Sequence, residues 1–162
     1  MTEDFNIVHA DGTDPDYIAL CNKLNTFQEN NVAGFKEHGL QVNYDLHKHK
    51  DVFIVYDGNK PIGCSCLWYH SDEVCEMIRI FVEEDYRGRH LVQLAVNKVE
   101  ELAKEKGYSE VHLRTWACTP SAPIAYDKLG YRPVSENSFP YPDKFPNALL
   151  LSSNRIYMMK DL

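Results

Sequence analysis

A cationic loop, Arg87-Gly88-Arg89, lies between an apolar stretch that ends at Val82 and an amphipathic stretch that begins at Leu91. This order predicts a strand, a short acidic turn, the loop and then a long helix. The first backbone N–H groups of a helix lack intrahelical partners and carry the positive end of the helix dipole, so they attract anions. Arginine side chains add charge-assisted donors whose geometry suits phosphate oxygens. The segment therefore predicts a diphosphate site at the end of a strand.

Neither G-x-x-x-x-G-K-[ST] nor G-x-G-x-x-G occurs in the sequence, so the loop is not a P-loop or a dinucleotide fingerprint. It resembles the [Q/R]-x-x-G-x-[G/A] loop by which the GNAT superfamily of acyltransferases grips acetyl-CoA. Arg87 matches the first position and Gly88 the residue that commonly follows it. His90 stands where the pattern has Gly, and Val92 where it has Gly or Ala. His90 could donate to a phosphate, be a surface helix residue or obstruct the loop, and β-branched Val92 favours obstruction or a shifted cofactor.

A second motif supports this resemblance. The run from Ala122 to Tyr131 is similar to the family's A-x-x-x-Y-[E/D]-K-x-G-[F/Y], with Tyr126 at its tyrosine position. The separation between Arg87 and Tyr126 also fits. The resemblance extends from about Val52 to the C-terminus, where the chain looks like the small-molecule branch of the family, and fits the N-terminal segment loosely.

The resemblance implies particular roles for two residues. Tyr126 would be the general acid that protonates the leaving sulfur of coenzyme A, a modest aid because a thiol ionises near pH 8.5. Glu76, in the strand before the loop, would accept the amine proton directly or through water. Each has a structural alternative: Tyr126 as a core aromatic of a helix, and Glu76 as a solvent-facing strand residue paired with a lysine.

The resemblance also implies acetyl-CoA as the acetyl donor. Backbone amides of the loop would hold the pyrophosphate, and a strand splayed from its neighbour would bind the pantetheine arm and the carbonyl oxygen. The residues implied in CoA binding are Ile80, Phe81, Val82, Arg87, Gly88, Arg89, His90, Leu91 and Thr119. The expected function is an N-acetyltransferase that moves an acetyl group to a primary amine of a small molecule by direct attack in a ternary complex.

Two other functions and one other reaction route remain to be weighed at this point. The chain could be a catalytically degenerate protein that binds CoA or another ligand as a sensor. The departures from the motif at His90 and Val92 are the features that leave this alternative open. It could acetylate a protein N-terminus or a lysine, although the aromatic segment Ser135 to Phe145, read as a pocket lid or a rigid connector, more plausibly closes a peptide groove. A ping-pong route through Cys75 or Cys118 is disfavoured, because nothing beside either thiol in sequence would activate it.

Length and composition limit the number of domains, the partners and the location that the chain is expected to have. A chain of 162 residues, 44% hydrophobic and 25% charged, is expected to form a single domain over residues 1–162. Its net charge of −7 argues against a nucleic-acid partner, and it either mildly favours a cationic substrate or serves solubility. No apolar run approaches the roughly 18 residues of a membrane span, and the N-terminus lacks a secretion signal. We expect a cytoplasmic protein with no membrane partner, and a homodimer is left open.

Cysteine and histidine spacing predicts no metal site. The five cysteines are odd in number and lie in apolar segments, so we expect buried, inert thiols. His47 and His49 belong to a charged loop and are interpreted as solvated residues, not as metal ligands. Trp68, Tyr69 and Trp116 could line the acceptor cleft, although core packing is favoured for at least two of them.

Apolar periodicity and turn residues predict the elements that must position these side chains. Asp14-Pro15 is typical of a helix start, Asp57-Gly58 of a hairpin turn, and Gly107 and Gly130 of helix ends. The expected strands are 5–10, 51–56, 61–69, 74–82, 110–116 and 156–160. The expected helices begin at about residues 15, 91 and 121, and a further short helix is expected to run through Phe35 and to be followed by a loop. The fold class is mixed α/β (α+β), a central, mostly antiparallel twisted sheet of about six to seven strands flanked by about four helices, which agrees with the GNAT fold.

Overall fold

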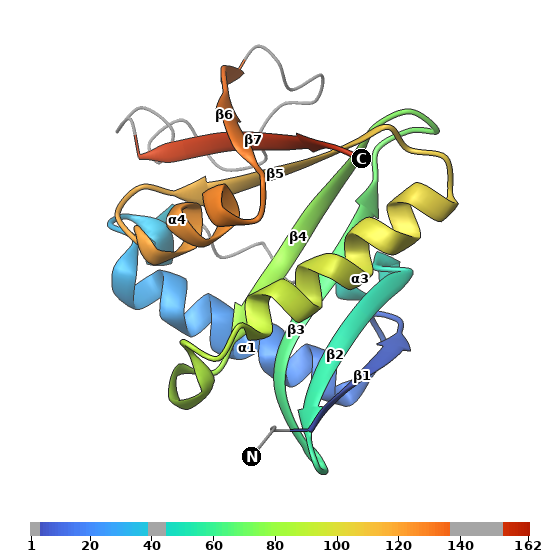
Figure 1. The fold of residues 1–162 in the computed structure, drawn as a ribbon. Coiled ribbons are helices and arrows are strands. Elements are labelled where there is room, and N and C mark those ends of the chain that lie inside the picture. The colour runs from blue at the N-terminus through green and yellow to red at the C-terminus, as the bar shows by residue number, and fades with distance from the viewer. Residues whose placement is uncertain (1–3, 39–44, 137–153) are drawn as a thin grey trace.

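The computed structural model describes residues 4–38, 45–136 and 154–162 of the chain. Within them, seven strands form one sheet in the order β1-β2-β3-β4-β5-β7-β6 (Figure 1). Every neighbouring pair is antiparallel except β4 and β5, which are parallel. The strands are β1 (Phe5–Ala10), β2 (Asp51–Asp57), β3 (Lys60–Tyr69), β4 (Cys75–Val82), β5 (Glu110–Trp116), β6 (Arg132–Val134) and β7 (Arg155–Asp161). The predicted fold class is confirmed.

The helices cover both faces of the sheet. Three of them have eight residues or more in the described part of the chain, namely α1 (Pro15–Asn31), α3 (Leu91–Glu105) and α4 (Ser121–Lys128), and α2 (Phe35–His38) is a single turn. Figure 1 shows α1 and α3 on opposite faces. Successive residues of β4 reflect this, because Met77 packs in the cluster under α3 and Ile78 against the cluster under α1.

Local sequence explains where the first helix begins. The Asp14 side chain accepts hydrogen bonds from the N–H groups of Asp16 (2.9 Å) and Tyr17 (3.4 Å), which have no partner within the helix. Pro15 follows as the first helical residue, where a missing N–H is harmless. Tyr17, Leu20, Cys21 and Leu24 then form the buried face of α1. This helix lies against β3 and β4, the strands that carry the candidate chemistry.

The centre of β4 contains a bulge. Cys64 of β3 pairs with Phe81 and Cys66 pairs with Ile78, so two residues of β4, Arg79 and Ile80, oppose the single residue between them. Arg79 adopts φ 55°, in the left-handed region that non-glycine residues rarely occupy. The Arg79 guanidinium donates to the Cys21 carbonyl (2.8 Å) and the Asn25 side chain (2.7 Å), which holds the bulge against α1.

The ladder between β4 and β5 is short. Its register pairs Glu76 with His112 and Met77 with Leu113. Beyond these pairs β4 continues to Val82 and β5 to Trp116, and the two strands diverge (Figure 1). The sheet therefore forks, and within the described residues the second half of β4 presents a backbone edge without a β5 partner.

Several details differ from the sequence-based expectations. The hairpin turn consists of Gly58 and Asn59, because Asp57 pairs with Lys60. The short strand β6 was not predicted. Cys118 is exposed, whereas the other four cysteines are buried as expected. Most of the segment from Ser135 to Phe145 lies outside the described residues.

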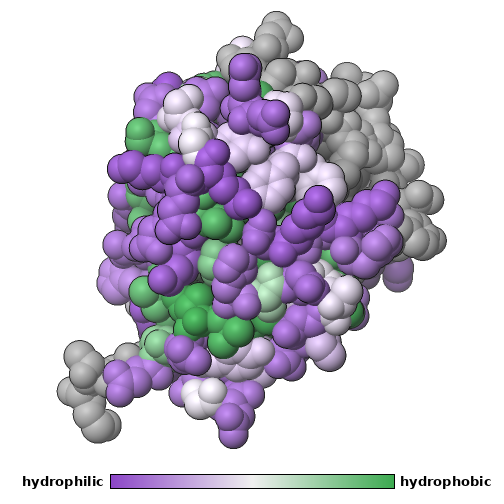
Figure 2. All heavy atoms as spheres, turned by 90° about the vertical axis from the view of Figure 1, so that its right-hand side faces the viewer, coloured by the Kyte–Doolittle hydropathy of each residue, from purple (hydrophilic) through white to green (hydrophobic). Residues whose placement is uncertain are grey.

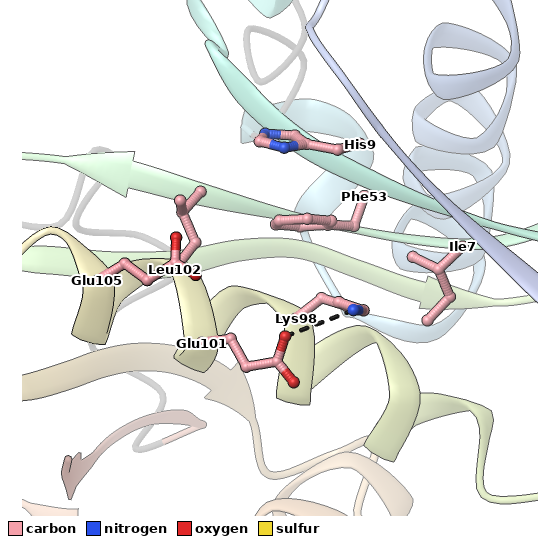
Figure 3. Close-up of a pocket in the computed structure, with 7 residues that line it drawn as sticks. All are labelled: Ile7, His9, Phe53, Lys98, Glu101, Leu102 and Glu105. Atoms are coloured by element: carbon pink, nitrogen blue, oxygen red, sulfur yellow. Dashed lines mark hydrogen bonds and ion pairs between the residues drawn. The ribbon is translucent and has the colours of Figure 1, made fainter.

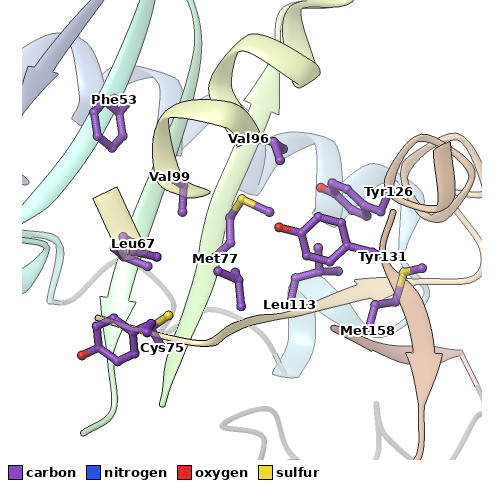
Figure 4. Close-up of a cluster of buried hydrophobic side chains, with 13 residues drawn as sticks. Phe53, Leu67, Cys75, Met77, Val96, Val99, Leu113, Tyr126, Tyr131 and Met158 are labelled. Atoms are coloured by element: carbon purple, nitrogen blue, oxygen red, sulfur yellow. The ribbon is translucent and has the colours of Figure 1, made fainter. Parts of the chain in front are cut away.

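One face of the surface and the packing of two tyrosines in the core complete the description of the fold. Figure 2 shows that the face on the right-hand side of Figure 1 is mostly hydrophilic, with its largest hydrophobic area in the lower half and smaller hydrophobic spots elsewhere. In the core, Tyr126 and Tyr131 lie side by side close to Val96 of α3 (Figure 4). Their ring centroids are 6.2 Å apart in an edge-to-face arrangement. This packing fixes α4 against the sheet beside the fork.

Candidate functional site

A cleft of about 410 Å³ opens at the fork between β4 and β5. Its walls come from α1, β3, β4, β5 and α4, and they include members of the clusters under both α1 and α3. The cleft therefore reaches from one face of the sheet to the other through the gap. Its lining residues are Leu24, Phe27, Gln28, Asp45, His49, Trp68, His70, Glu76, Met77, Ile78, Arg79, Ile80, Arg114, Thr115, Trp116, Thr119, Ala122, Tyr126 and Arg155.

Glu76 lies in the wall of this cleft at the start of the fork. It is 7% exposed, so the structure does not support the alternative of a solvent-facing residue. Its Oε1 is 2.9 Å from Nε2 of His70, and its Oε2 is 3.6 Å from Nε of Arg114. Where that alternative expected a lysine, Glu76 instead has a histidine and an arginine as neighbours. A buried carboxylate with one hydrogen-bonded and one cationic neighbour is well placed to meet a protonated amine.

Tyr126 lines the same cleft from α4 and is 6% exposed. Its ring packs in the cluster under α3, so the tyrosine is both a core aromatic and a wall of the cleft. Burial raises the pKa of its phenol well above the ordinary value, because the phenolate would lose its hydration. The hydroxyl therefore stays protonated at neutral pH and can act as a proton donor.

The residues predicted to contact the pantetheine arm are distributed on both sides of the fork. Ile80 and Thr119 line the cleft, from β4 and from the turn before α4. Phe81 and Val82 are buried, in the cluster under α1 and in a smaller cluster with Leu91. Their side chains serve the core, so only their backbone groups are candidates for ligand contacts. This division fits the expectation that the strand backbone holds the acyl chain.

The loop before α3 is exposed and does not line the cleft. The Leu94 N–H donates to the carbonyl of the N-cap His90 (3.4 Å), so the amides before Leu94 belong to the helix N-terminus. Gly88 has φ 80°, and a Cβ built there would meet nothing within 4 Å. The open surface and the unpaired helical donors suit a diphosphate.

The two arginines of the loop lie against aromatic rings. Arg87 donates from Nε to the Val82 carbonyl (3.1 Å), and its guanidinium is 4.9 Å from the centroid of Phe27. The Arg89 guanidinium is 5.0 Å from the centroid of Tyr86. Both side chains are exposed, so both are accessible to an anion at the helix start.

The two departures from the motif have different structural consequences. His90 is the exposed N-cap of α3 with φ 60°, and its side chain makes no capping hydrogen bond. The backbone at this position thus takes the conformation that glycine favours, although the residue is histidine. Val92 is partly buried and packs against the clusters on that side of the sheet. The Val92 side chain therefore contributes to core packing.

Three residues of the cleft were missed or misread from the sequence. His49 is buried, in contrast to the solvated residue that was expected, and its Nδ1 is 2.7 Å from the Tyr17 hydroxyl. His70 and Arg114 were not considered, although both contact Glu76. Of the aromatic candidates, Trp68 and Trp116 line the cleft, and Tyr69 is absent from its lining.

A second hollow, of about 220 Å³, lies between β1, β2 and α3. Figure 3 shows the rings of His9 and Phe53 stacked above Lys98 and Glu101 of the helix. None of the residues predicted to bind CoA or to act in catalysis lines it. The cleft at the fork is therefore the better candidate.

No group of three or more His, Cys, Asp or Glu side chains in residues 4–38, 45–136 and 154–162 is arranged to hold a metal ion. No helix in the same part of the chain has the length and apolar character required to cross a membrane.

Known proteins share this fold and part of this sequence. The model of the acetyltransferase (GNAT) family matches residues 19–131. An uncharacterized N-acetyltransferase of Methanocaldococcus jannaschii is 34% identical over 93 residues, which cover 53% of this chain and 41% of the relative. The chain thus spans less than half the length of that relative.

Two solved structures extend the comparison to nearly the whole chain. An acetyltransferase from Streptococcus agalactiae has a TM-score of 0.79 at 15% identity, covering 99% of this chain and 100% of the other. N-acetylglutamate synthase from Neisseria gonorrhoeae, solved with coenzyme A and N-acetyl-glutamate, has a TM-score of 0.73 at 14% identity, covering 100% of this chain and 36% of the other. At these identities the likeness establishes the fold.

Proposed function

Since the chain belongs to the acetyltransferase (GNAT) family, we propose that it is an enzyme that transfers an acetyl group from acetyl-CoA to a primary amine of a small molecule. The observation that carries the proposal is the cleft at the fork of the sheet, which brings a buried carboxylate, Glu76, and a buried phenol, Tyr126, to one cavity. These are the two groups that acetyl transfer to an amine would use.

Acetyl-CoA supplies the acetyl group: its carbonyl–sulfur bond breaks as the carbon–nitrogen bond forms. An ammonium nitrogen loses two protons, one before it attacks and one afterwards, of which the sulfur gains one and the solvent the other. The chain's part is to hold the donor and to move these protons. The backbone edge of β4 after Met77, without a β5 partner among the described residues, offers N–H and C=O groups to an extended acyl chain. The helix start at Leu91 and the arginines beside it offer donors to the diphosphate.

Glu76 is the proposed acceptor of the amine proton. Aliphatic amines are protonated at neutral pH, so the nitrogen must lose a proton before it can attack. The hydrogen bond to His70 (2.9 Å) orients the carboxylate, and the cleft shields it from bulk water. A carboxylate held in this way contributes typically 10²- to 10⁴-fold to a rate as a general base.

Tyr126 is the proposed donor of a proton to the sulfur. Its phenol is held neutral by burial, so it is available as an acid over the whole physiological pH range. It enters the cleft from α4, whereas Glu76 enters from β4. The acceptor would approach between α1 and the sheet, where His49, Trp68 and His70 line the cavity, and attack the acetyl group in a ternary complex.

The names of related proteins support a small acceptor. A mycothiol acetyltransferase of Corynebacterium glutamicum is 31% identical over 97 residues, and human N-acetylaspartate synthetase is 32% identical over 78 residues. Each of these names contains a small molecule, mycothiol in the first and N-acetylaspartate in the second. The one-domain organisation over residues 1–162, the cytoplasmic location and a homodimer stay predictions from the sequence.

The test is turnover of a mixture of primary amines by the purified protein with acetyl-CoA, with acetylated products identified by mass spectrometry. Glu76→Gln should lower kcat/KM by at least about 100-fold, because glutamine cannot accept the proton. Glu73→Gln is the matched control, since Glu73 is an exposed carboxylate three residues away. Binding of acetyl-CoA without any acetylated amine would favour a sensor. Acetylation of peptides alone would favour a protein acetyltransferase.

A further inference from the structure

The side chain of Phe27 joins the cleft to the loop before α3. Phe27 belongs to the C-terminal half of α1 and lines the cleft. The Arg87 guanidinium lies over the same ring, 4.9 Å from its centroid. Arg87 itself does not line the cleft, so this contact connects the expected site of the acyl chain to the expected site of the diphosphate.

A second contact of α1 with the same segment supports this placement. Lys23 stands about one turn before Phe27 on the helix and forms an ion pair with Glu83, with 2.6 Å between Nζ and Oε1. Glu83 and Arg87 flank the short turn that follows β4, Glu84–Tyr86. The helix therefore contacts both ends of this turn, which leads from the cleft wall to the start of α3.

Arg87 is held by part of its guanidinium and offers the rest to a ligand. Its Nε donates to the Val82 carbonyl (3.1 Å), and the planar group faces the ring of Phe27. Within residues 4–38, 45–136 and 154–162, Arg87 forms no other hydrogen bond or ion pair. The side chain is exposed, and Nη1 and Nη2 carry the remaining N–H groups, whose parallel geometry suits phosphate oxygens.

An arginine that is fixed before its ligand arrives contributes more to affinity. A flexible side chain loses rotamer freedom when it binds, whereas a side chain that is already ordered loses less. We propose that Phe27 is a positioning residue for coenzyme A, because its ring fixes the Arg87 guanidinium with Nη1 and Nη2 toward the diphosphate. This inference rests on the proposed function, since it takes acetyl-CoA as the acetyl donor. It assigns part of the affinity for the donor to α1, which lies outside both motifs.

A role of Phe27 in packing alone would have different consequences. Its side chain is partly buried and packs against the cluster under α1, so shortening it also removes apolar contacts. Loss of these contacts would act on the protein whether or not Arg87 is present. Loss of positioning would weaken the binding of coenzyme A only while Arg87 is present. Combined substitutions at the two positions therefore separate the two roles.

The test is a double-mutant cycle, in which calorimetry measures the Kd of CoA for Phe27→Leu, Arg87→Met and the double variant. Phe27→Leu should raise the Kd by about 3- to 10-fold, the range for immobilising one flexible side chain on binding. Arg87→Met should raise it by roughly 10- to 100-fold, because charge-assisted hydrogen bonds are lost. The Kd of the double variant should stay within about twofold of that of Arg87→Met.

Two conservative variants test the stacked pair itself. Phe27→Tyr keeps the aromatic ring, so its Kd should stay within about threefold of that of the unaltered protein. Arg87→Lys keeps the charge but loses the planar group and the bond from Nε, so its Kd should rise by at least about fivefold. Arg132→Met is the control, because Arg132 is an exposed arginine of β6 paired with Asp161 and should leave the Kd unchanged.

The outcomes separate the inference from the proposed function. An equal effect of Phe27→Leu with and without Arg87, or no effect of Phe27→Leu at all, would overturn the inference while the acetyltransferase function stands. If Phe27→Leu does not fold, Arg87→Lys decides: a Kd within about twofold of the unaltered protein would overturn the inference, and a rise of at least about fivefold would support it. No binding of CoA to the unaltered protein would overturn the function and the inference together.

Discussion

Replacing Tyr126 with phenylalanine separates a proton donor from a packing residue. The substitution removes only a hydroxyl and keeps the ring that packs 6.2 Å from Tyr131. General acids typically contribute 10²- to 10⁴-fold, but a thiolate leaves reasonably well without help, so we expect kcat to fall by about 10- to 100-fold. That loss corresponds to about 1.4–2.7 kcal/mol of activation free energy.

The assay measures kcat, the affinity for acetyl-CoA and Tm on the same preparation. We expect the affinity to change less than about threefold and Tm to shift by a few degrees at most, since the substitution is worth about 1 kcal/mol or less in stability. Tyr131→Phe is the matched control. Tyr131 is the neighbouring buried tyrosine of the same cluster, but it does not line the cleft.

Two results would refute this reasoning. If Tyr131→Phe lowers kcat as much as Tyr126→Phe does, the loss comes from the core and not from a proton donor. If Tyr126→Phe weakens acetyl-CoA binding as strongly as it lowers kcat, the hydroxyl supports binding and has no specific part in the transfer step.

The remaining predictions concern stability. Glu76→Gln should lower the free energy of unfolding by about 1–3 kcal/mol in urea denaturation, because it removes the charge from the buried contacts of Glu76 with His70 and Arg114, and a loss below 0.5 kcal/mol would contradict them. His90→Gly should raise the free energy of unfolding by about 0.5–1 kcal/mol, and Gly88→Ala should lower it by about 1 kcal/mol, because both positions have left-handed backbones. A change of the opposite sign in either variant would contradict that conformation. Burial raises the pKa of both Tyr126 and Tyr131 above the value near 10 of the unfolded chain. The contribution of these two tyrosines to the free energy of unfolding is therefore intact below pH 10 and is lost as the pH rises above it, by about 1.4 kcal/mol per pH unit for each tyrosine. A free energy of unfolding that stays level to pH 11 would contradict their burial.

Much of the fold could be predicted because its determinants are local. Asp14-Pro15 starts α1 as expected, since a capping side chain and a proline act within one turn. The strand from Glu110 to Trp116 has its expected bounds because apolar runs between turn residues define it. The strand β6, with three residues, is too short to carry a periodic pattern, and only its pairing with β7 makes it a strand.

The site was predictable only where a motif marked it. Glu76 and Tyr126 were predicted as site residues through the resemblance to a family, and both line the cleft. Arg114 and His70 were missed because their contacts with Glu76 depend on the parallel register of β4 with β5 and on the path of the chain after β3. No local pattern reports such pairings. His49 was misread for a related reason, because the partner that keeps it buried, Tyr17, lies on α1, 32 residues away in sequence.

A crystal structure of the protein with coenzyme A tests the central claim most directly. The account predicts the pantetheine arm in the fork, along β4 between Ile78 and Val82, with the thiol close to Tyr126 and the diphosphate at the start of α3. Coenzyme A bound elsewhere, for example in the hollow between β1 and α3, or a thiol remote from both Tyr126 and Glu76, would contradict the account.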